Sequence, residues 1–231
     1  MNFSLPSGLT TGNTFARVRL SSDGNLNARG PAADGEVEDY VVNILAPPTV
    51  TQVVVNGGDM QRSSLKTLTV IFDRVVNVDQ ASGDPFQFIN TGTNQPVTEI
   101  PVISDDGVRT TVEFTFAPGA SVADWGSLLD GNYRLTINSA LVTSFGAALD
   151  GDGNGTTGGN YVFGATAMDK FYRKYGDVNG NGIVDLLDFA DFRRAFGKAS
   201  SDSGYIESLD SDGDMMIGLL DFAAFRRNFG T

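Results

Sequence analysis

An internal repeat near the carboxyl end constrains the fold of this chain more than any other feature of its sequence. Residues 177–197 align with residues 210–230 at an offset of 33. Each copy begins with twelve residues rich in Asp, Asn and Gly, and continues into the same short run of Phe, Ala and Arg. A solenoid needs at least three stacked repeats, so two copies are too few for one. The repeat therefore predicts a pair of acidic loops, each followed by an amphipathic helix.

The spacing of oxygen side chains in each loop predicts a calcium site. Side chains at loop positions 1, 3 and 5, the carbonyl at position 7 and an acid at position 12 give Ca²⁺ oxygen ligands at roughly 2.3–2.6 Å, whereas Mg²⁺ demands stricter octahedral geometry. The predicted ligands of the first loop are Asp177, Asn179, Asn181, the carbonyl of Ile183, Asp188, and Asp185 at position 9, where a water can intervene. Those of the second loop are Asp210, Asp212, Asp214, the carbonyl of Met216, and Asp221.

The alternative to calcium binding is a pair of Asx-rich turns that only cap helices. Two such loops in register, each followed by the same helix, favour calcium. Position 6 is Gly182 in the first loop and Met215 in the second, and a left-handed turn there costs a non-Gly residue about 1–2 kcal/mol. We therefore predict that the second site is the weaker one. We also expect Val184 and Ile217, at position 8, to pair the two loops through a short β-bridge.

Composition removes most other kinds of site. The 231 residues include no His and no Cys, which excludes disulfides, thiolate metal sites, serine triads and the usual zinc sites. With 16 basic and 28 acidic side chains, the net charge is −12, which argues against a nucleic-acid partner. No run approaches the roughly 18 apolar residues of a membrane span. Hard cations, or an enzyme with paired carboxylates, remain.

Short runs rich in Val, Thr, Ile and Phe, separated by Gly-containing turns, predict β-strands before the repeat. Two strands, one of them half-buried, are expected at 15–20 and 40–45, before Pro47 and Pro48. Two or three strands rarely stand alone, so residues 1–46 are expected to be the C-terminal part of a larger domain. Seven further strands predict an antiparallel sandwich with Trp125 and the Leu128–Leu129 pair at one end of its core. They are expected at 49–55, 65–72, 86–90, 97–103, 110–116, 133–138 and 161–163.

The spacing of apolar residues changes after Ala165. Apolar residues recur with helical spacing at 168–175 and again at 186–196, which predicts a small helical unit. The predicted fold class is multidomain, with an antiparallel β-sandwich followed by a small α-helical module that holds paired EF-hand-like calcium loops. The expected boundaries are 1–46, 47–166 and 167–231.

The two loop–helix units resemble the type I dockerin over about residues 176–231. That resemblance implies calcium binding, attachment to a cohesin module and an extracellular or cell-surface setting, commonly with polysaccharide-degrading enzymes. In dockerins the partner is contacted by loop positions 10 and 11 and by a basic pair further along the helix. Here those positions hold Leu186, Leu187, Arg193, Arg194, Leu219, Leu220, Arg226 and Arg227. Helical spacing places Leu186 with the core phenylalanines, which leaves Leu187 and Leu220 as the expected exposed contacts. The basic pairs also favour the helix dipole, which is an equal alternative for them.

The β segments carry two further resemblances. Residues 34–40, Asp-Gly-Glu-Val-Glu-Asp-Tyr, resemble the signature of the GEVED domain, a bacterial extracellular β module. Residues 47–166 resemble a bacterial Ig-like domain in their strand spacing and in their place before a dockerin. The whole arrangement is similar to the C-terminal end of large secreted proteins of planctomycete-type bacteria.

A third acidic loop is a candidate for a further calcium site. Asp150, Asp152 and Asn154 repeat the spacing of positions 1, 3 and 5, but Tyr161 stands where the closing acid belongs. The alternative is a flexible Gly-Asp loop.

These features favour a non-catalytic, calcium-binding docking and spacer region with a cohesin-like partner. One alternative is an accessory region of a glycoside hydrolase whose catalytic domain lies upstream, since two carboxylates suffice for that chemistry. Another is a sandwich that binds cell-surface polysaccharide through exposed aromatics such as Trp125.

Overall fold

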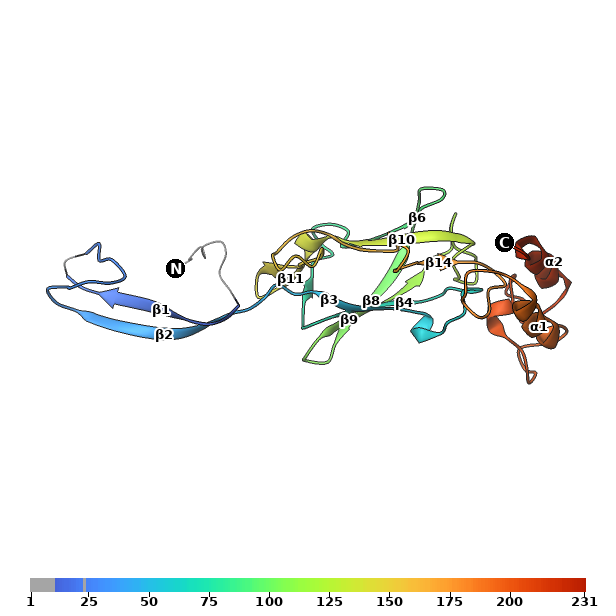
Figure 1. Cartoon of the computed structure of the whole chain (residues 1–231), viewed down its shortest axis with the longest axis horizontal. Coiled ribbons are helices and arrows are strands. Elements are labelled where there is room, and N and C mark those ends of the chain that lie inside the picture. The colour runs from blue at the N-terminus through green and yellow to red at the C-terminus, as the bar shows by residue number, and fades with distance from the viewer. Residues whose placement is uncertain (1–10, 23) are drawn as a thin grey trace. The chain divides into compact units, whose positions relative to one another are not determined.

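Figure 1 shows the computed structural model, which describes residues 11–22 and 24–231. The chain divides between Ala46 and Pro47 into two compact units. Within the described residues, no helix has both the length and the apolar character needed to cross a membrane.

The first unit contains an antiparallel strand pair. Strand β1 (Gly12–Leu20) runs against β2 (Glu36–Ile44), with Gly12 opposite Ile44 and Leu20 opposite Glu36. The expected half-burial of the first strand is wrong, because Phe15 and Leu20 are 69% and 72% exposed. No further layer packs on this two-stranded sheet among the described residues, so both of its faces remain open.

The second unit contains the predicted antiparallel β-sandwich. One sheet has the order β3-β4-β9-β8. It is built from Val50–Val55 (β3), Leu68–Phe72 (β4), Thr110–Phe116 (β9) and Glu99–Asp105 (β8). The other has the order β13-β10-β6-β7, with β14 also paired to β10. It is built from Tyr161–Phe163 (β13), Gly131–Ile137 (β10), Phe86–Asn90 (β6), Gln95–Val97 (β7) and Tyr172–Arg173 (β14). A small third sheet joins Asn77–Val78 (β5), Val142–Ser144 (β11) and Ala147–Ala148 (β12).

Alternating side chains fill the sandwich core. In β9, Thr110, Val112, Phe114 and Phe116 are buried while Glu113 and Thr115 are exposed. Phe114 lies edge-to-face against Phe86, with ring centroids 4.9 Å apart, and this geometry is favourable for aromatic pairs.

Three sequence predictions in the sandwich need correction. The single strand expected at 97–103 is two strands, because the chain leaves one sheet after Val97 and enters the other at Glu99. Leu128 is buried in the core as expected, but Leu129 is 40% exposed. Trp125 is only partly buried and lies outside the sandwich core, because its ring contacts the carboxyl-terminal module instead.

The carboxyl-terminal module contains the two predicted helices, α1 (Leu186–Ala195) and α2 (Leu219–Asn228). Short 3₁₀ turns occur at Asn56–Gly58, Ser139–Leu141 and Glu207–Leu209. The helix expected at 168–175 is wrong. Phe171 is buried in the sandwich core instead, and its carbonyl accepts a hydrogen bond from the Tyr133 amide at 2.7 Å. Phe171 thus belongs to the sandwich core, whereas Tyr175 belongs to the core of the helical module.

A second, smaller core holds the helical module together. It is separate from the sandwich core and includes the rings of Phe192 and Phe225, whose centroids are 4.9 Å apart. Its buried members are Tyr175, Val184, Phe192, Ala195, Leu209, Ile217 and Phe225. A core of this size gives modest stability by itself, so the module depends on further contacts.

Candidate metal centres

The first loop folds around the carboxylate of Asp177, which is fully buried. One of its oxygens accepts the amide of Asn181 at 3.0 Å, and the other accepts the amide of Gly182 at 2.9 Å. The hydroxyl of Tyr172 donates to the second oxygen at 2.9 Å. The carboxylate at position 1 thus fixes the backbone of positions 5 and 6.

The acid at position 12 closes the same loop from the helix side. Asp188 is fully buried, and its Oδ1 accepts the amides of Val178 at 2.9 Å and Asn179 at 3.3 Å. Its Oδ2 accepts the amide of Asp185 at 2.9 Å, while the Asp185 carboxylate accepts the amide of Leu187 at 2.8 Å. This reciprocal pair is a capping box, so one set of bonds both starts α1 and closes the loop.

The second loop has a similar frame, in which the acid at position 1 bonds the amides of positions 4 and 6 instead of positions 5 and 6. Asp210 accepts the amides of Gly213 at 2.7 Å and Met215 at 2.8 Å, and the hydroxyl of Tyr205 at 2.8 Å. Asp221 accepts the amides of Ser211 and Gly218, both at 2.6 Å. Gly218 has no side chain, so this helix has only half of the capping arrangement found in α1.

The backbone at position 6 is left-handed in both loops, as expected. Gly182 has φ 89° and Met215 has φ 67°. Position 4 is also left-handed, with φ 72° at Gly180 and 77° at Gly213. Three of these four positions hold glycine, and Met215 is the one that accepts strain.

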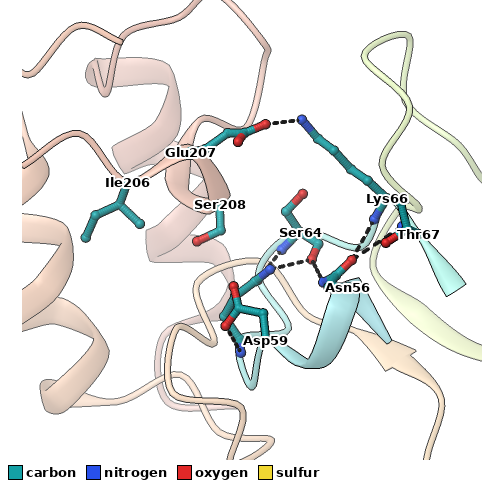
Figure 2. Close-up of a pocket in the computed structure, with 9 residues that line it drawn as sticks. Asn56, Asp59, Ser64, Lys66, Thr67, Ile206, Glu207 and Ser208 are labelled. Atoms are coloured by element: carbon teal, nitrogen blue, oxygen red, sulfur yellow. Dashed lines mark hydrogen bonds and ion pairs between the residues drawn. The ribbon is translucent and has the colours of Figure 1, made fainter. Parts of the chain in front are cut away.

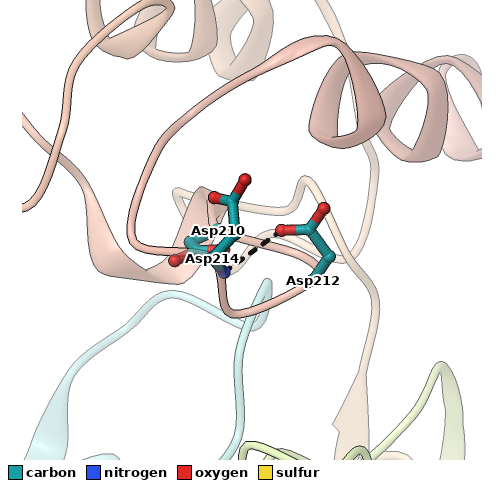
Figure 3. A group of neighbouring side chains, drawn as sticks. All are labelled: Asp210, Asp212 and Asp214. Carbon is teal, nitrogen blue, oxygen red and sulfur yellow. Dashed lines mark hydrogen bonds between the residues drawn. The ribbon is translucent and has the colours of Figure 1, made fainter.

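Three carboxylates of the second loop converge, as Figure 3 shows. Ligand oxygens of Asp210, Asp212 and Asp214 lie within 4.8 Å of one another, so the group could hold a metal ion. Burial raises the pKa of Asp212, and the neighbouring carboxylates of Asp221, Asp214 and Asp210 raise it as well. The first loop has Asn179 and Asn181 at positions 3 and 5, and so carries less negative charge there.

Among the described residues, the buried acids of the two loops have no cationic partner. Asp177, Asp188, Asp210 and Asp221 are at most 5% exposed. Within residues 11–22 and 24–231, neither Lys nor Arg forms an ion pair with any of them. Buried charges in proteins are generally paired or bound to a metal. Two carboxylates per loop, with further side-chain oxygens at positions 3 and 5, fit a hard divalent cation.

The predicted β-bridge between the loops is wrong. The amide of Val184 donates to the carbonyl of Thr231 at 3.3 Å, and its carbonyl accepts the amide of Gly230 at 2.8 Å. Ile217 pairs in the same way with Lys198 at 2.9 Å and Gly197 at 2.8 Å. The first loop therefore pairs with the residues after α2, and the second loop pairs with the residues after α1. These pairings use the backbone groups at position 8 that a bridge between the loops would need.

Two tyrosines bond to the loops, and the loop motif in the sequence did not predict this role. Tyr172 and Tyr205 each precede position 1 by five residues, and each donates to its carboxylate. Burial raises the pKa of both phenols, and the bond to the carboxylate raises it further. The signal was present, because the two tyrosines are 33 residues apart, the same offset as the repeat.

The expected partner contacts are exposed on the helices. Leu187 and Leu220 are each 68% exposed, and the pairs Arg193–Arg194 and Arg226–Arg227 lie exposed in the last turns. The prediction that Leu186 belongs to the core is wrong, because it is 72% exposed. Since α1 begins at Leu186, Val184 just before the helix fills the core in its place.

An apolar groove lies between the two helices. Its volume is about 260 Å³. The residues that line it are Phe189, Phe192, Arg193, Phe196, Leu219 and Phe222. An apolar groove with a guanidinium among its lining residues suits a partner that offers an apolar side chain beside an acidic one.

The third acidic loop has the same local frame as the first. Asp150 is 5% exposed and accepts the amides of Asn154 at 3.0 Å and Gly155 at 2.8 Å. The amide of Asn154 also donates to Asp152, and the amide of Thr156 donates to Asn154. Gly153 and Gly155 are left-handed, with φ 72° and 84°. Three oxygen side chains are thus gathered, without an acid from a following helix.

The architecture is that of a modular β protein whose last module presents two acidic loop–helix units on a small apolar core. Residues 175–229 match the family model of the dockerin type I domain, and residues 1–43 match that of the GEVED domain. These matches confirm the resemblance to a dockerin preceded by a GEVED segment, and both are non-catalytic modules. No curated protein and no solved structure matches the chain.

Proposed function

We propose that residues 167–231 form a calcium-stabilised docking module of a secreted or cell-surface protein. Residues 47–166 serve as an Ig-like spacer before it, and residues 1–46 belong to a GEVED-like β domain. The proposal is supported by the dockerin match at 175–229 and by the similar hydrogen-bond frames of the two loops. Extracellular calcium is commonly millimolar, so even sites of 10⁻⁴–10⁻³ M affinity, on the order found in extracellular modules, are filled there.

The observation that carries the proposal is the set of four buried carboxylates that form no ion pair with a Lys or Arg in the part of the chain that the structure describes. Asp177 with Asp188, and Asp210 with Asp221, are the outer members of the two predicted ligand sets. Without a cation, the acids of each loop repel one another at close range. A bound Ca²⁺ removes that repulsion and stabilises the folded state by about 2.7 kcal/mol per site at a hundredfold excess over Kd.

Calcium titration of the full chain tests this function. Isothermal calorimetry is expected to show at least two equivalents of Ca²⁺, one for each loop of the docking module, and circular dichroism is expected to lose helical signal on addition of EGTA. Mg²⁺ at equal concentration is the matched control and should bind more weakly, because it dehydrates reluctantly. An unchanged helical signal and no heat of calcium binding would refute the proposal.

The docking surface is proposed to be the exposed side of α1 and α2. Leu187 and Leu220 supply apolar contacts, and Arg193, Arg194, Arg226 and Arg227 supply charge. Arg residues are enriched among the side chains that dominate binding energy. The partner is a cohesin-like module with an apolar patch and an acidic rim.

Charge reversal on α1 tests the docking surface. The double variant Arg193→Glu and Arg194→Glu should weaken binding to a cohesin module at least tenfold, because the introduced carboxylates repel an acidic rim. Arg109→Glu, an exposed position on the sandwich, is the control and should bind normally. Equal binding by both variants would place the docking surface elsewhere.

We propose Asp150, Asp152 and Asn154 as a third, weaker calcium site, on the strength of the frame that this loop shares with the first. The site has no acid at position 12, so it depends more on water ligands. Calorimetry of the parent chain is expected to show a third equivalent of Ca²⁺. Asp152→Ala should lose this third equivalent and keep the first two. A stoichiometry of two in the parent chain rejects it.

A further inference from the structure

The sandwich contacts both acidic loops of the docking module. The first contact is made by residues 60–63, in the segment between β3 and β4. The amide of Arg62 donates to the carbonyl of Asp177 at 2.8 Å, and the carbonyl of Arg62 accepts the amide of Lys174 at 2.9 Å. Gly180 packs so closely on Met60 that an added Cβ would lie 1.8 Å from the Met60 carbonyl oxygen. The start of the first loop is therefore held by sandwich backbone.

A buried hydroxyl links the two repeats to the sandwich. Ser63 is fully buried, and its Oγ accepts the amide of Gly176 at 2.8 Å while it donates to the carbonyl of Ser208 at 2.6 Å. Gly176 precedes position 1 of the first loop, and Ser208 lies two residues before position 1 of the second. One sandwich side chain thus bonds the segments that lead into both loops.

The second loop rests on the single tryptophan of the chain. Gly213 packs against Trp125, and an added Cβ would lie 2.9 Å from the indole Cδ1. The ammonium of Lys66 lies 5.2 Å from the indole centroid and pairs with Glu207 at 2.5 Å. Figure 2 shows Lys66 reaching toward Glu207 beside a pocket of about 300 Å³ that both modules line. The ion pair is largely exposed and adds little stability, so the tryptophan and the serine are the principal contacts.

A third connection reaches the end of α2. Asp130, just before β10, accepts the guanidinium of Arg173 at 2.6 Å and the amide of Tyr175 at 2.6 Å. Its other oxygen accepts the side-chain amide of Asn228 at 2.7 Å. The sandwich therefore holds the module at both loops and at its last helix.

We infer that the sandwich is a positioning element of the calcium sites, with Ser63 and Trp125 as its main contacts. This inference rests on the proposed calcium function. By holding the segments that lead into the loops and the glycine at position 4 of each loop, the sandwich raises the fraction of molecules whose loops are ready to bind. Apparent affinity scales with that fraction. By linkage, calcium in the loops stabilises the sandwich in return. Sandwich and docking module then unfold as one cooperative unit.

Trp125 fluorescence and calorimetry on the full chain test the inference. Added Ca²⁺ is expected to change the emission of Trp125 in step with one equivalent of bound ion, and to slow amide exchange in β4 and β9. Ser63→Ala should weaken calcium binding by about thirtyfold, which is the loss of two hydrogen bonds of about 1 kcal/mol each converted at about 1.4 kcal/mol per tenfold. Ser144→Ala is the matched control. Ser144 is also a buried sandwich serine that donates to a carbonyl, Val75 at 2.8 Å, but it lies on β11. It should leave calcium affinity unchanged.

The possible outcomes separate this inference from the proposed function. If calcium binds but Ser63→Ala binds it as tightly as the parent chain, the sandwich does not position the loops, while the calcium function stands. The inference also fails, and the calcium function stands, if the chain unfolds in two resolved thermal transitions and calcium raises the midpoint of only one of them. If the parent chain shows no heat of calcium binding, the calcium function itself fails.

Discussion

The two acidic loops have similar hydrogen-bond frames but reach them from different sequences. The first has Gly182 at position 6, Asp185 at the helix cap and Asn at positions 3 and 5. The second has Met215 in a left-handed conformation, Gly218 at the cap and Asp at positions 3 and 5. The first loop is thus the less strained, and the second carries more charge toward an ion.

This difference shows that stability and affinity are separate properties of the two loops. More carboxylates strengthen calcium binding, whereas strain at Met215 opposes folding of the same loop. The prediction from the sequence that the second site is weaker rests on the strain at Met215, and it stays a prediction. It holds if the strain outweighs the additional charge of Asp212 and Asp214.

The largest expected effect comes from removing the acid at position 12. Asp188→Ala leaves three backbone amides without an acceptor and Asp221→Ala leaves two. At about 1–3 kcal/mol for each donor left without an acceptor, the losses in unfolding free energy are on the order of 3–9 kcal/mol for Asp188→Ala and 2–6 kcal/mol for Asp221→Ala. Each variant should also bind one Ca²⁺ fewer. Denaturant unfolding and calorimetry measure both, with exposed Asp124→Ala as a silent control. A larger loss of unfolding free energy in Asp221→Ala than in Asp188→Ala would contradict the prediction that the acid of the first loop contributes more to stability.

The second-largest expected loss of stability comes from removing the tyrosine hydroxyls that bond to the loops. Tyr172→Phe and Tyr205→Phe each remove a hydrogen bond to a buried carboxylate, worth about 1.5–3 kcal/mol. Tyr172 also donates to the carbonyl of Gly180 at 3.3 Å, so its loss should be the greater. Denaturant unfolding at neutral pH in EGTA provides the measurement.

The same phenols predict an alkaline loss of stability. Their folded pKa values lie above the ordinary 10.0, so the folded state keeps protons that the unfolded chain releases. Stability should therefore fall as pH rises above about 10. The fall should be shallower in each Phe variant. An identical pH profile in the parent and variants would mean that these phenols do not carry the effect.

Exchanging the residues at position 6 isolates the strain. Met215→Gly should stabilise the chain by about 1 kcal/mol and tighten calcium binding at the second loop. Gly182→Ala should cost about 1–2 kcal/mol, since the new Cβ meets nothing closer than the Tyr172 hydroxyl at 3.6 Å and strain is the main change. Thermal unfolding and calcium titration follow both. No gain in affinity for Met215→Gly would count against strain as the reason for a weaker second site.

The sequence predicted those parts of the structure that local spacing determines. Loop positions and helices follow from a repeat in which each side chain has a fixed place, so α1, α2 and the left-handed position 6 were predicted correctly. The role of Trp125 and the pairing of Val184 and Ile217 were not. Both depend on contacts between segments far apart in the chain, such as Trp125 with Gly213, which residue periodicity does not encode.

The same limit explains the helix wrongly expected at 168–175. The spacing of its apolar residues fits a helix, but Phe171 completes the sandwich core and Tyr172 reaches the first loop. This segment connects the two modules, so tertiary contacts override its local pattern. The exposure of Leu186 was also not predictable from local spacing, because the position at which α1 begins decides which side chain reaches the core.

The smallest expected effect concerns the helix caps. Gly218→Asp should give α2 the cap that Asp185 gives α1, and Asp185→Gly should remove it from α1. Gly is a tolerable N-cap, so each change is worth only a few tenths of a kcal/mol, in opposite directions. Gly218 has φ −115°, which Asp adopts without strain. Because an added Cβ would lie 3.8 Å from Asp221, the new carboxylate brings repulsion that calcium relieves. The gain from Gly218→Asp should therefore be larger in calcium than in EGTA, and thermal unfolding in the two buffers measures the difference. A gain of equal size in both would show that Asp at position 9 acts on the helix alone and not on the ion.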